Sequence, residues 1–149
     1  MTRPQPTAAG GGDGSGQGGS GGVGIRTGTD IVPTSRVNSL VRESGERFLE
    51  TLLTAGEIED CTTDRGISLD AVAARLAAKE AVFKTLHAPR SSLPWLSIEV
   101  RRTSGGWPEV ELHGVARTLA LEAGVAELSV SISHDGGFAI AVAVAAVRQ

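Results

Sequence analysis

The stretch LDAVAARLAAKEAVFKTLH, residues 69–87, is the longest run of helical spacing in the chain and decides its fold. Apolar side chains recur along it at steps of three and four residues, namely Leu69, Val72, Leu76, Phe83 and Leu86. This is the spacing of one face of an α-helix, so the stretch predicts a long helix that buries a single stripe. Asp70 can cap its start, and Pro89 follows its expected end near His87.

Three further elements are expected before this helix. They are a short strand at 23–32, a helix from a Thr34 or Ser35 cap to about Leu53, and a short helix that begins at the capping-box sequence TAGE, residues 54–57. Gly45 weakens the middle of the first helix, and a loop at 62–68 leads into the long one.

The second half of the chain changes to the alternating patterns that are typical of strands. Strands are expected at 96–101, around 110–112, at 128–133 and at 138–147, with a short helix at 114–123 that Gly124 ends. The last of these strands does not alternate but is apolar on both faces. Helices cluster first and antiparallel strands follow. This order favours the α+β class, with antiparallel strands packed against the long helix and short helices around it.

Composition excludes several classes of protein. The 149 residues carry 14 Lys and Arg against 17 Asp and Glu, a balance that argues against a dedicated nucleic-acid binder. No apolar run of about eighteen residues occurs, so no membrane span is expected, and residues 1–24 lack the apolar core of a signal peptide. The single cysteine, Cys61, cannot form an internal disulfide or a cysteine zinc site, so we expect the reducing cytoplasm.

Half of the 20 glycines lie between Gly10 and Gly24. A segment of Gly, Ser, Pro, Gln and Thr has almost nothing to bury and cannot offset its ordering entropy. Residues 1–22 are therefore expected to form a disordered tail, either the stub of a linker or a dispensable extension. Residues 23–149 are expected to form one domain.

The long helix carries a carboxylate beside its apolar stripe. Glu80 lies four residues after Leu76 and three before Phe83, and Lys84 lies one turn further on. An ordinary surface pair of Glu and Lys would stabilise the helix by ~0.2–0.5 kcal/mol. A carboxylate that borders a core is costly without a cation, however, and the only two lysines among the 14 basic residues, Lys79 and Lys84, flank Glu80. Lysine offers a compact charge whose pKa can be tuned for proton transfer, which favours a chemical role.

Asp30 is a second candidate, because it follows Gly-Thr at the end of an apolar strand. It is either a turn or helix-capping aspartate, or one of two carboxylates that converge from separate elements. Two carboxylates with waters and a phosphate are what Mg²⁺ needs. Solvated surface positions are the simpler interpretation of three other candidates, His134 beside a Gly-Gly turn and Arg75 and Lys79 on the helix.

Four segments, in the same order and spacing, resemble the holo-acyl-carrier-protein synthase family, the short branch of the 4′-phosphopantetheinyl transferases. They are IRTGTDIV at 25–32, FLETLLTAGE at 48–57, RLAAKEAVFK at 75–84 and SISH at 131–134. The third segment is highly specific and the first moderately so, whereas the last is weak alone. The resemblance covers about residues 23–147 and leaves out the tail.

The resemblance implies an enzyme that transfers 4′-phosphopantetheine from coenzyme A to a serine of an apo acyl carrier protein or carrier domain, releasing adenosine 3′,5′-bisphosphate. The residues that match Asp30 and Glu80 hold Mg²⁺ against the pyrophosphate, where the metal neutralises developing charge and orients the phosphoryl group. The lysine that matches Lys84 lies near the pyrophosphate, where it stabilises the leaving group or moves a proton. The base that activates the serine is either a metal-held water or a carboxylate.

The resemblance also implies how coenzyme A is held. The histidine that matches His134 helps to hold it from a neighbouring subunit, and Arg75 and Lys79 are phosphate-side or structural positions. Longer, two-domain relatives carry a second acid two residues after the metal-binding aspartate. Here that position is Val32, so a water would complete the metal shell. The chain therefore resembles the single-domain branch, which forms homotrimers with active sites between subunits.

Carrier recognition is expected on the first helix, because carrier proteins present an acidic helix to it. Arg36 and Arg47 are eleven residues apart and so on one helical face, and Arg42 is nearby. Glutamates at 43, 46 and 50 dilute this charge. The dilution favours a less acidic partner, such as a carrier domain of a polyketide or fatty-acid assembly line.

A non-catalytic module that binds coenzyme A or a carrier protein is the alternative from a different class. Such a module would have little reason to keep Asp30, Glu80 and Lys84 together, so their presence favours the enzyme. A nucleotide-binding regulatory domain is less well supported, because the sequence has no phosphate loop.

Overall fold

A computed structural model describes residues 21–149 of the chain. The expected tail at 1–22 lies outside the described residues except for Gly21 and Gly22, so the division into tail and domain stays a prediction. The first strand, β1, spans Val23–Pro33, where the sequence predicted it.

The long helix, α3, spans Leu69–Leu86 as expected, but its cap differs from the prediction. Ser68 is the N-cap, and its hydroxyl accepts a hydrogen bond from the backbone N–H of Ala71 at 3.2 Å. Asp70 instead lies in the first turn and accepts a 2.6 Å hydrogen bond from the Thr34 hydroxyl. The predicted cap at Asp70 is therefore wrong, because the helix begins at Leu69 and the serine before it supplies the capping oxygen.

Buried side chains occupy every side of α3 rather than the single stripe that the spacing predicted. They are Val72, Ala73, Ala74, Arg75, Leu76, Ala77, Ala78, Lys79, Ala81, Val82, Thr85 and Leu86. Five alanines let neighbouring elements approach the helix closely on both sides, which a pattern of large apolar residues alone does not reveal.

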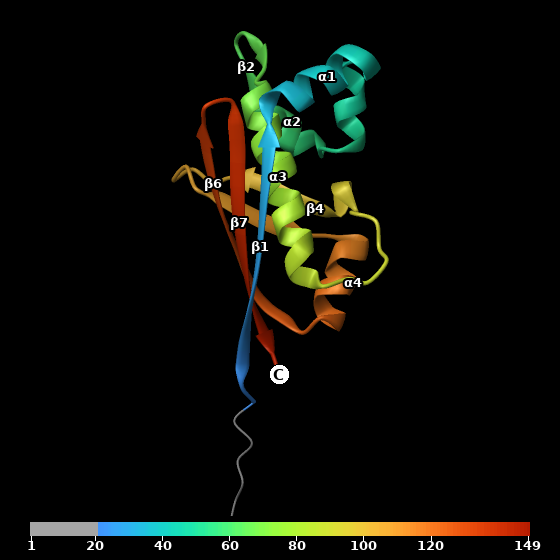
Figure 1. The fold of residues 1–149 in the computed structure, drawn as a ribbon, viewed down its shortest axis with the longest axis vertical. Helices are drawn as coiled ribbons and strands as arrows, with labels where there is room; N and C mark the ends of the chain where they lie inside the picture. Colours follow the sequence, from blue (N-terminus) through green and yellow to red (C-terminus); the bar gives the residue numbers. More distant parts are fainter. Residues whose placement is uncertain (1–20) are drawn as a thin grey trace, which may run out of the picture.

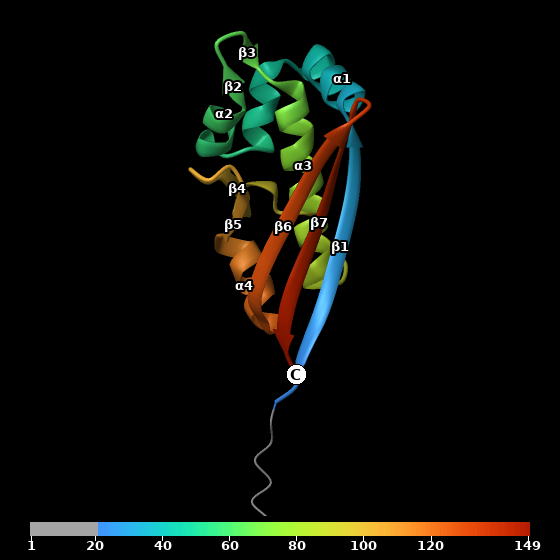
Figure 2. The same ribbon diagram turned by 90° about the vertical axis from the view of Figure 1, so that its left-hand side faces the viewer.

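A three-stranded antiparallel sheet packs along one side of α3 (Figures 1 and 2). Its strand order is β1, β7 (Phe138–Arg148) and β6 (Val125–Asp135), with Asp30 paired to Ala141 and Ala141 to Ile132. Residues paired in this way point to the same face, so Asp30 lies on the face that α3 covers.

The contact between β1 and α3 is unusually close at Gly28, which is buried. A Cβ atom at this position would overlap the carbonyl oxygen of Ala81 and lie 3.0 Å from Cβ of Lys84. The absence of a side chain at Gly28 therefore allows the strand and the helix to touch backbone to backbone.

The first helix is shorter than expected. α1 spans Thr34–Ser44 and ends at Gly45, whose φ of 81° lies outside the helical region. A separate 3₁₀ helix, η1, follows at Glu46–Thr51, so the prediction of one helix to about Leu53 is wrong. The predicted cap is also wrong, because Pro33 occupies the N-cap position and no side chain caps the helix.

The short helix α2, Ala55–Cys61, begins as predicted. Thr54 and Glu57 form the complete capping box, with the Glu57 backbone N–H donating to the Thr54 hydroxyl and the Thr54 N–H donating to the Glu57 carboxylate. The expected loop at 62–68 contains a small hairpin of strands β2 (Thr62–Thr63) and β3 (Gly66–Ile67).

A second layer lies on the other side of α3 from the sheet (Figure 2). It consists of η2 (Trp95–Ser97), the hairpin of β4 (Ile98–Arg102) and β5 (Pro108–Leu112), and α4 (Gly114–Glu122). The predicted α+β class, with antiparallel strands packed on a long helix, is confirmed.

The outer face of the three-stranded sheet is apolar and exposed. Strand β7 alternates buried alanines with large exposed side chains, and β1 adds two more to the same face. The exposed apolar residues there are Ile25, Ile31, Phe138, Ile140, Val142 and Val144. No helix in the described part of the chain is long and apolar enough to cross a membrane.

Candidate active site

Asp30 and Glu80 come from different elements and meet at the contact between β1 and α3. Asp30 projects from β1 toward the helix, and Glu80 lies on α3 next to Ala81, which touches Gly28. Lys84 lies one turn further along the same helix. The structure thus brings together three candidates of which the first and the last, Asp30 and Lys84, are 54 positions apart in the sequence.

Lys84 bridges to the strand rather than to Glu80. Its Nζ donates a 2.7 Å hydrogen bond to the backbone oxygen of Thr29 and lies 3.2 Å from Oδ1 of Asp30. The Asp30 side chain is 14% exposed, and its second oxygen, Oδ2, is buried without a hydrogen-bond partner. An unpaired carboxylate oxygen in such a place is costly unless a donor or a cation binds it.

Glu80 has a perturbed carboxyl group. Burial raises the pKa of Glu80, and the neighbouring carboxylate of Asp30 raises it further. The charges of Lys84 and Arg36 oppose the rise in this pKa. Two carboxylates pressed together in a half-buried position are an arrangement that a bound cation would relieve.

The donor set fits a small, hard cation such as Mg²⁺. Asp30 and Glu80 provide oxygen ligands, and the free Oδ2 of Asp30 is available to a metal. Mg²⁺ takes few protein ligands and fills its shell with waters and phosphate oxygens. Within residues 21–149, no group of three or more His, Cys, Asp and Glu side chains could hold a metal, so the protein would supply only this pair. Val32, two residues after Asp30, is buried in the core.

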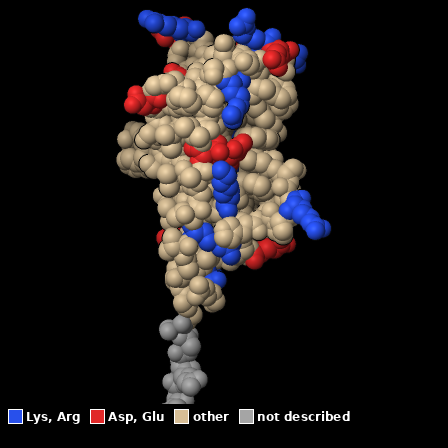
Figure 3. All heavy atoms as spheres, viewed as in Figure 1, with Lys and Arg blue, Asp and Glu red and all other residues tan. Residues whose placement is uncertain are grey.

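An apolar pocket of about 230 Å³ opens beside Glu80. Arg36 and Glu80 supply its charged groups. Its apolar lining consists of Val32, Leu40, Phe48, Leu52, Leu76 and Trp95. The pocket therefore connects the acidic pair to α1, the helix that carries Arg36 and Arg42. On the surface in Figure 3, an acidic patch lies between basic side chains above and below it on the face that carries β1 and α3.

A second pocket, of about 150 Å³, gathers positive charge elsewhere. Arg75, Arg102 and His134 line it together with Ala74, Gly106, Pro108 and Ile132. Arg75 is only 6% exposed, and its Nε is buried without a partner. A desolvated guanidinium with a free donor suits an anionic ligand, and a phosphate group matches its geometry.

The two pockets lie on different sides of α3. Arg75 and Glu80 are five residues apart, which is about 140° around a helix. The two pockets also have no lining residue in common. Within one chain, therefore, the structure groups His134 with Arg75 and does not bring either to the acidic pair.

Lys79 lies in neither pocket. It is wholly buried, and its Nζ is 2.6 Å from the Glu57 carboxylate and donates to the backbone oxygens of Leu52 at 2.7 Å and Trp95 at 2.8 Å. Burial lowers the pKa of Lys79, and the charge of Glu57 opposes this. All its donors are used within the fold, which favours the structural interpretation of Lys79 over a phosphate contact.

The three arginines expected to meet a carrier protein do not share one helical face. Arg36 and Arg42 lie on α1, whereas Arg47 lies beyond the break at Gly45, in η1. The argument from an eleven-residue spacing is therefore wrong, because it requires an unbroken helix. All three side chains are exposed, and Arg42 lines a shallow surface hollow with Ser39 and Glu43.

Two residues near the pockets were missed from the sequence. Arg102 lines the basic pocket, yet it stands in a strand beside Arg101 with no pattern to separate the two. Glu57 was recognised only as a capping residue, although its other carboxylate oxygen accepts a 2.7 Å hydrogen bond from the backbone of Val100 and it pairs with Lys79. A glutamate that caps a helix next to a buried lysine leaves no separate signal in the sequence.

Known proteins are similar to this chain in sequence. A family model described as the 4′-phosphopantetheinyl transferase superfamily matches residues 26–143. The holo-[acyl-carrier-protein] synthase of Desulforudis audaxviator is 39% identical over 118 residues, which is 79% of this chain and 89% of that protein. That of Moorella thermoacetica is 41% identical over 121 residues, which is 80% of this chain and 91% of that protein.

Solved structures agree with these relatives. The holo-[acyl-carrier-protein] synthase of Helicobacter pylori in complex with coenzyme A is similar with a TM-score of 0.67 and 31% identity, covering 83% of this chain and 100% of that one. The holo-ACP synthase of Plasmodium yoelii gives a TM-score of 0.71 at 28% identity, covering 86% and 99% of the two chains.

Proposed function

The chain belongs to the 4′-phosphopantetheinyl transferase superfamily, and we propose that it works as a holo-[acyl-carrier-protein] synthase. The observation that carries this proposal is the meeting of Asp30 and Glu80 beside Lys84, within the segment of the chain that matches the family. A module that only bound coenzyme A would not need an acidic pair with a free carboxylate oxygen.

The reaction would move a phosphoryl group from one oxygen to another. The hydroxyl oxygen of the carrier serine forms a bond to the phosphorus that bears the pantetheine arm, and the pyrophosphate P–O bond of coenzyme A breaks. Adenosine 3′,5′-bisphosphate leaves with the electron pair, and the serine proton passes to a base. A metal-held water or a carboxylate would accept that proton.

Asp30 and Glu80 are the residues that would hold Mg²⁺. When bound, the ion would neutralise charge on the phosphates and orient the reacting group. The protein's own contribution is to bring two carboxylates together from a strand and a helix and to leave Oδ2 of Asp30 without a hydrogen-bond donor. Lys84 orients the other oxygen of Asp30, and its exposed ammonium group can stabilise negative charge on the leaving group.

The basic pocket is proposed to hold phosphate of coenzyme A. Arg75 and His134 were expected there from the resemblance, and their common pocket with Arg102 supports both assignments. The free Nε of Arg75 offers a donor, and the charges of the two arginines attract an anion.

The active form is proposed to be a homotrimer with active sites between subunits. Two observations support this. The exposed apolar face formed by Ile31, Ile140, Val142 and their neighbours would be covered by another copy of the chain. The basic pocket and the acidic pair also lie on different sides of α3, so one coenzyme A could bridge them only if the pocket of one subunit adjoined the acidic pair of the next.

The carrier protein is proposed to dock on α1 and η1. Arg36, Arg42 and Arg47 are exposed there, and Arg36 also lines the apolar pocket that contains Glu80. This pocket would connect the surface on which the carrier protein docks to the acidic pair.

We also propose a cytoplasmic location, in which the buried, unpaired Cys61 stays reduced.

The test is to incubate the protein with coenzyme A, Mg²⁺ and apo carrier proteins from fatty-acid and polyketide assembly lines, and then to weigh the carriers by mass spectrometry. We expect at least one carrier to gain the mass of a single phosphopantetheine group. A carrier whose serine is replaced by alanine is the control. Binding of coenzyme A without a mass gain on any carrier would instead identify a binding module.

A further inference from the structure

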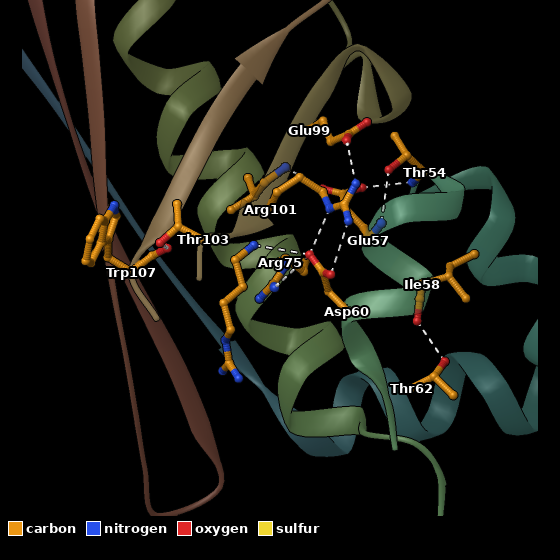
Figure 4. Close-up of polar contacts among 12 residues, drawn as sticks. Thr54, Glu57, Ile58, Asp60, Thr62, Arg75, Glu99, Arg101, Thr103 and Trp107 are labelled. Atoms are coloured by element: carbon orange, nitrogen blue, oxygen red, sulfur yellow. Dashed lines mark hydrogen bonds and ion pairs between the residues drawn. The ribbon is translucent and has the colours of Figure 1, made fainter. Parts of the chain in front are cut away.

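Asp60, near the end of α2, lies at the centre of an ion-pair network (Figure 4). Its Oδ2 accepts hydrogen bonds from Nε of Arg101 at 2.8 Å and from the backbone N–H of Arg102 at 3.1 Å. Its Oδ1 accepts a longer bond from Nη2 of Arg101 at 3.3 Å, and Nη2 of Arg75 lies 3.9 Å from Oδ2. One carboxylate thus links α2 to both α3 and β4.

Two of these three arginines line the basic pocket. Arg75 and Arg102 face it together with His134, whereas Arg101 is not part of its lining. Asp60 is therefore in contact with the side chain of one pocket residue and the backbone of the other. It does not line the pocket itself, so any effect of Asp60 on a ligand there passes through these residues.

Arg101 is the main ion-pair partner of Asp60. The hydrogen bond from Arg101 holds the pKa of Asp60 below its ordinary range, so this carboxyl stays ionised. Both bonds to Arg101 are shorter than the 3.9 Å contact with Arg75. Asp60 can therefore orient Arg75 without neutralising it, and the charge of Arg75 remains beside the pocket that this residue lines.

We propose that Asp60 is a positioning residue for coenzyme A: it fixes the Arg75 side chain and the Arg102 backbone so that both cations face the pocket at His134. This inference rests on the proposed function, which assigns that pocket to phosphate of coenzyme A. Asp60 contacts neither the acidic pair nor Lys84. It should therefore control the binding of coenzyme A and leave the transfer step unchanged.

The test compares Asp60→Asn with Glu99→Gln by steady-state kinetics at varied coenzyme A. The two side chains are both 17% exposed, both lie beside Arg101, and each substitution removes one negative charge. We expect Asp60→Asn to raise KM for coenzyme A about fivefold with kcat unchanged, because contacting residues couple by this order of magnitude. Glu99→Gln should leave both constants within about twofold of wild type.

A role of Asp60 in charge balance alone predicts the opposite change in KM for coenzyme A. If Asp60 only balanced charge, both substitutions would free a cation and lower KM for coenzyme A to a similar extent. An unchanged or lowered KM in Asp60→Asn, or a fall in kcat alone, would overturn the proposal. A wild-type protein that neither binds coenzyme A nor modifies a carrier would refute the proposed function instead, so the two failures are distinguishable.

A double mutant tests whether the effect passes through Arg75. In an Arg75→Ala background, Asp60→Asn should change the dissociation constant for coenzyme A by less than it does in the wild-type background, because only the route through the Arg102 backbone then remains. A full, additive effect would show that Asp60 acts by another route. If Asp60→Asn does not fold, Arg101→Gln is the second variant. Without the Arg101 guanidinium, Asp60 can pair with Arg75 and neutralise it, so KM for coenzyme A should rise. An unchanged KM would overturn the proposal.

Discussion

Lys84 engages one oxygen of Asp30, at 3.2 Å, and leaves the other oxygen buried without a partner. The ammonium group therefore fixes the orientation of the carboxylate without saturating it. The second donor bond of Lys84, to the backbone oxygen of Thr29, holds the lysine itself in place. A cation bound between Asp30 and Glu80 would give this oxygen a partner.

Glu80→Gln should reduce transfer to the carrier by at least about 100-fold while the fold remains intact. The pKa of Glu80 is raised by burial first and by Asp30 second, so the ionised carboxyl destabilises the metal-free protein above that pKa. The wild type should accordingly gain stability as the pH falls through the raised pKa. Glu80→Gln should lose this gain and show a Tm at pH 7, without metal, at or above that of wild type.

Calorimetry between pH 4 and 8 measures this effect, with the exposed Glu122→Gln as control. Full activity in Glu80→Gln would remove this residue from the proposed metal site. A large drop in its Tm at pH 7 would contradict the unfavourable environment of the carboxyl.

Lys84→Met should lower kcat by about 10- to 100-fold, because it removes a positive charge from the reacting region. The Lys84 side chain is 52% exposed, so the substitution leaves no buried cavity. Stopped-time assays of carrier mass at saturating coenzyme A measure kcat directly. A kcat equal to that of wild type, with only the stability altered, would show that Lys84 serves the fold alone.

Lys79→Met should destabilise the protein by about 3–5 kcal/mol, because it leaves the charge of Glu57 buried without a cation. Urea unfolding measures the loss. The double variant Lys79→Met with Glu57→Gln should recover part of it, since no buried charge then remains. KM for coenzyme A should stay unchanged in the folded fraction; a specific rise in this KM would restore Lys79 as a phosphate contact.

Val142→Lys should dissociate the proposed trimer, because it places a charge at the centre of the apolar sheet face. Light scattering after size-exclusion chromatography measures the mass in solution, and transfer activity should fall in parallel. Val115→Lys is a matched control, since this valine on α4 is also exposed but lies away from the sheet. A wild-type monomer with full activity would exclude active sites between subunits.

Arg36→Glu should raise KM for the carrier protein about tenfold and leave KM for coenzyme A within twofold, because reversing the charge repels an acidic helix. The effect should weaken as salt is raised. Arg117→Glu, a similar reversal on the exposed side of α4, is the control. Unchanged carrier kinetics would move the docking surface away from α1.

The sequence was sufficient for the elements whose signals are local. The capping box at Thr54 and Glu57, the alternation in β6 and the continuous apolar run of β7 lead to the observed elements. Gly45 shows the limit: a glycine within a helical pattern either weakens a helix or ends it, and only its φ of 81° decides. The wrong end of this helix also made the predicted docking surface wrong, because Arg36 and Arg47 share a face only if one helix contains both.

The site itself was only partly accessible from sequence. Asp30, Glu80 and Lys84 were selected because each is chemically out of place, and the fold brings them together. Lys79 was selected by the same reasoning, yet its partner Glu57 lies 22 positions away, and nothing local reveals that the two are buried together. Pairings across the fold, such as Asp60 with Arg75, are set by tertiary packing and leave no periodic trace.

Gly28 determines how closely the two elements that carry the acidic pair approach each other. It lies two residues before Asp30, and it touches Ala81, the residue after Glu80, through backbone atoms alone. Main-chain contact between the strand and the helix thus sets the distance between the backbones that carry the two carboxylates, and side-chain rotation acts only within that limit. A methyl group at position 28 would overlap the carbonyl oxygen of Ala81, so it would force β1 away from α3 and carry Asp30 away from Glu80.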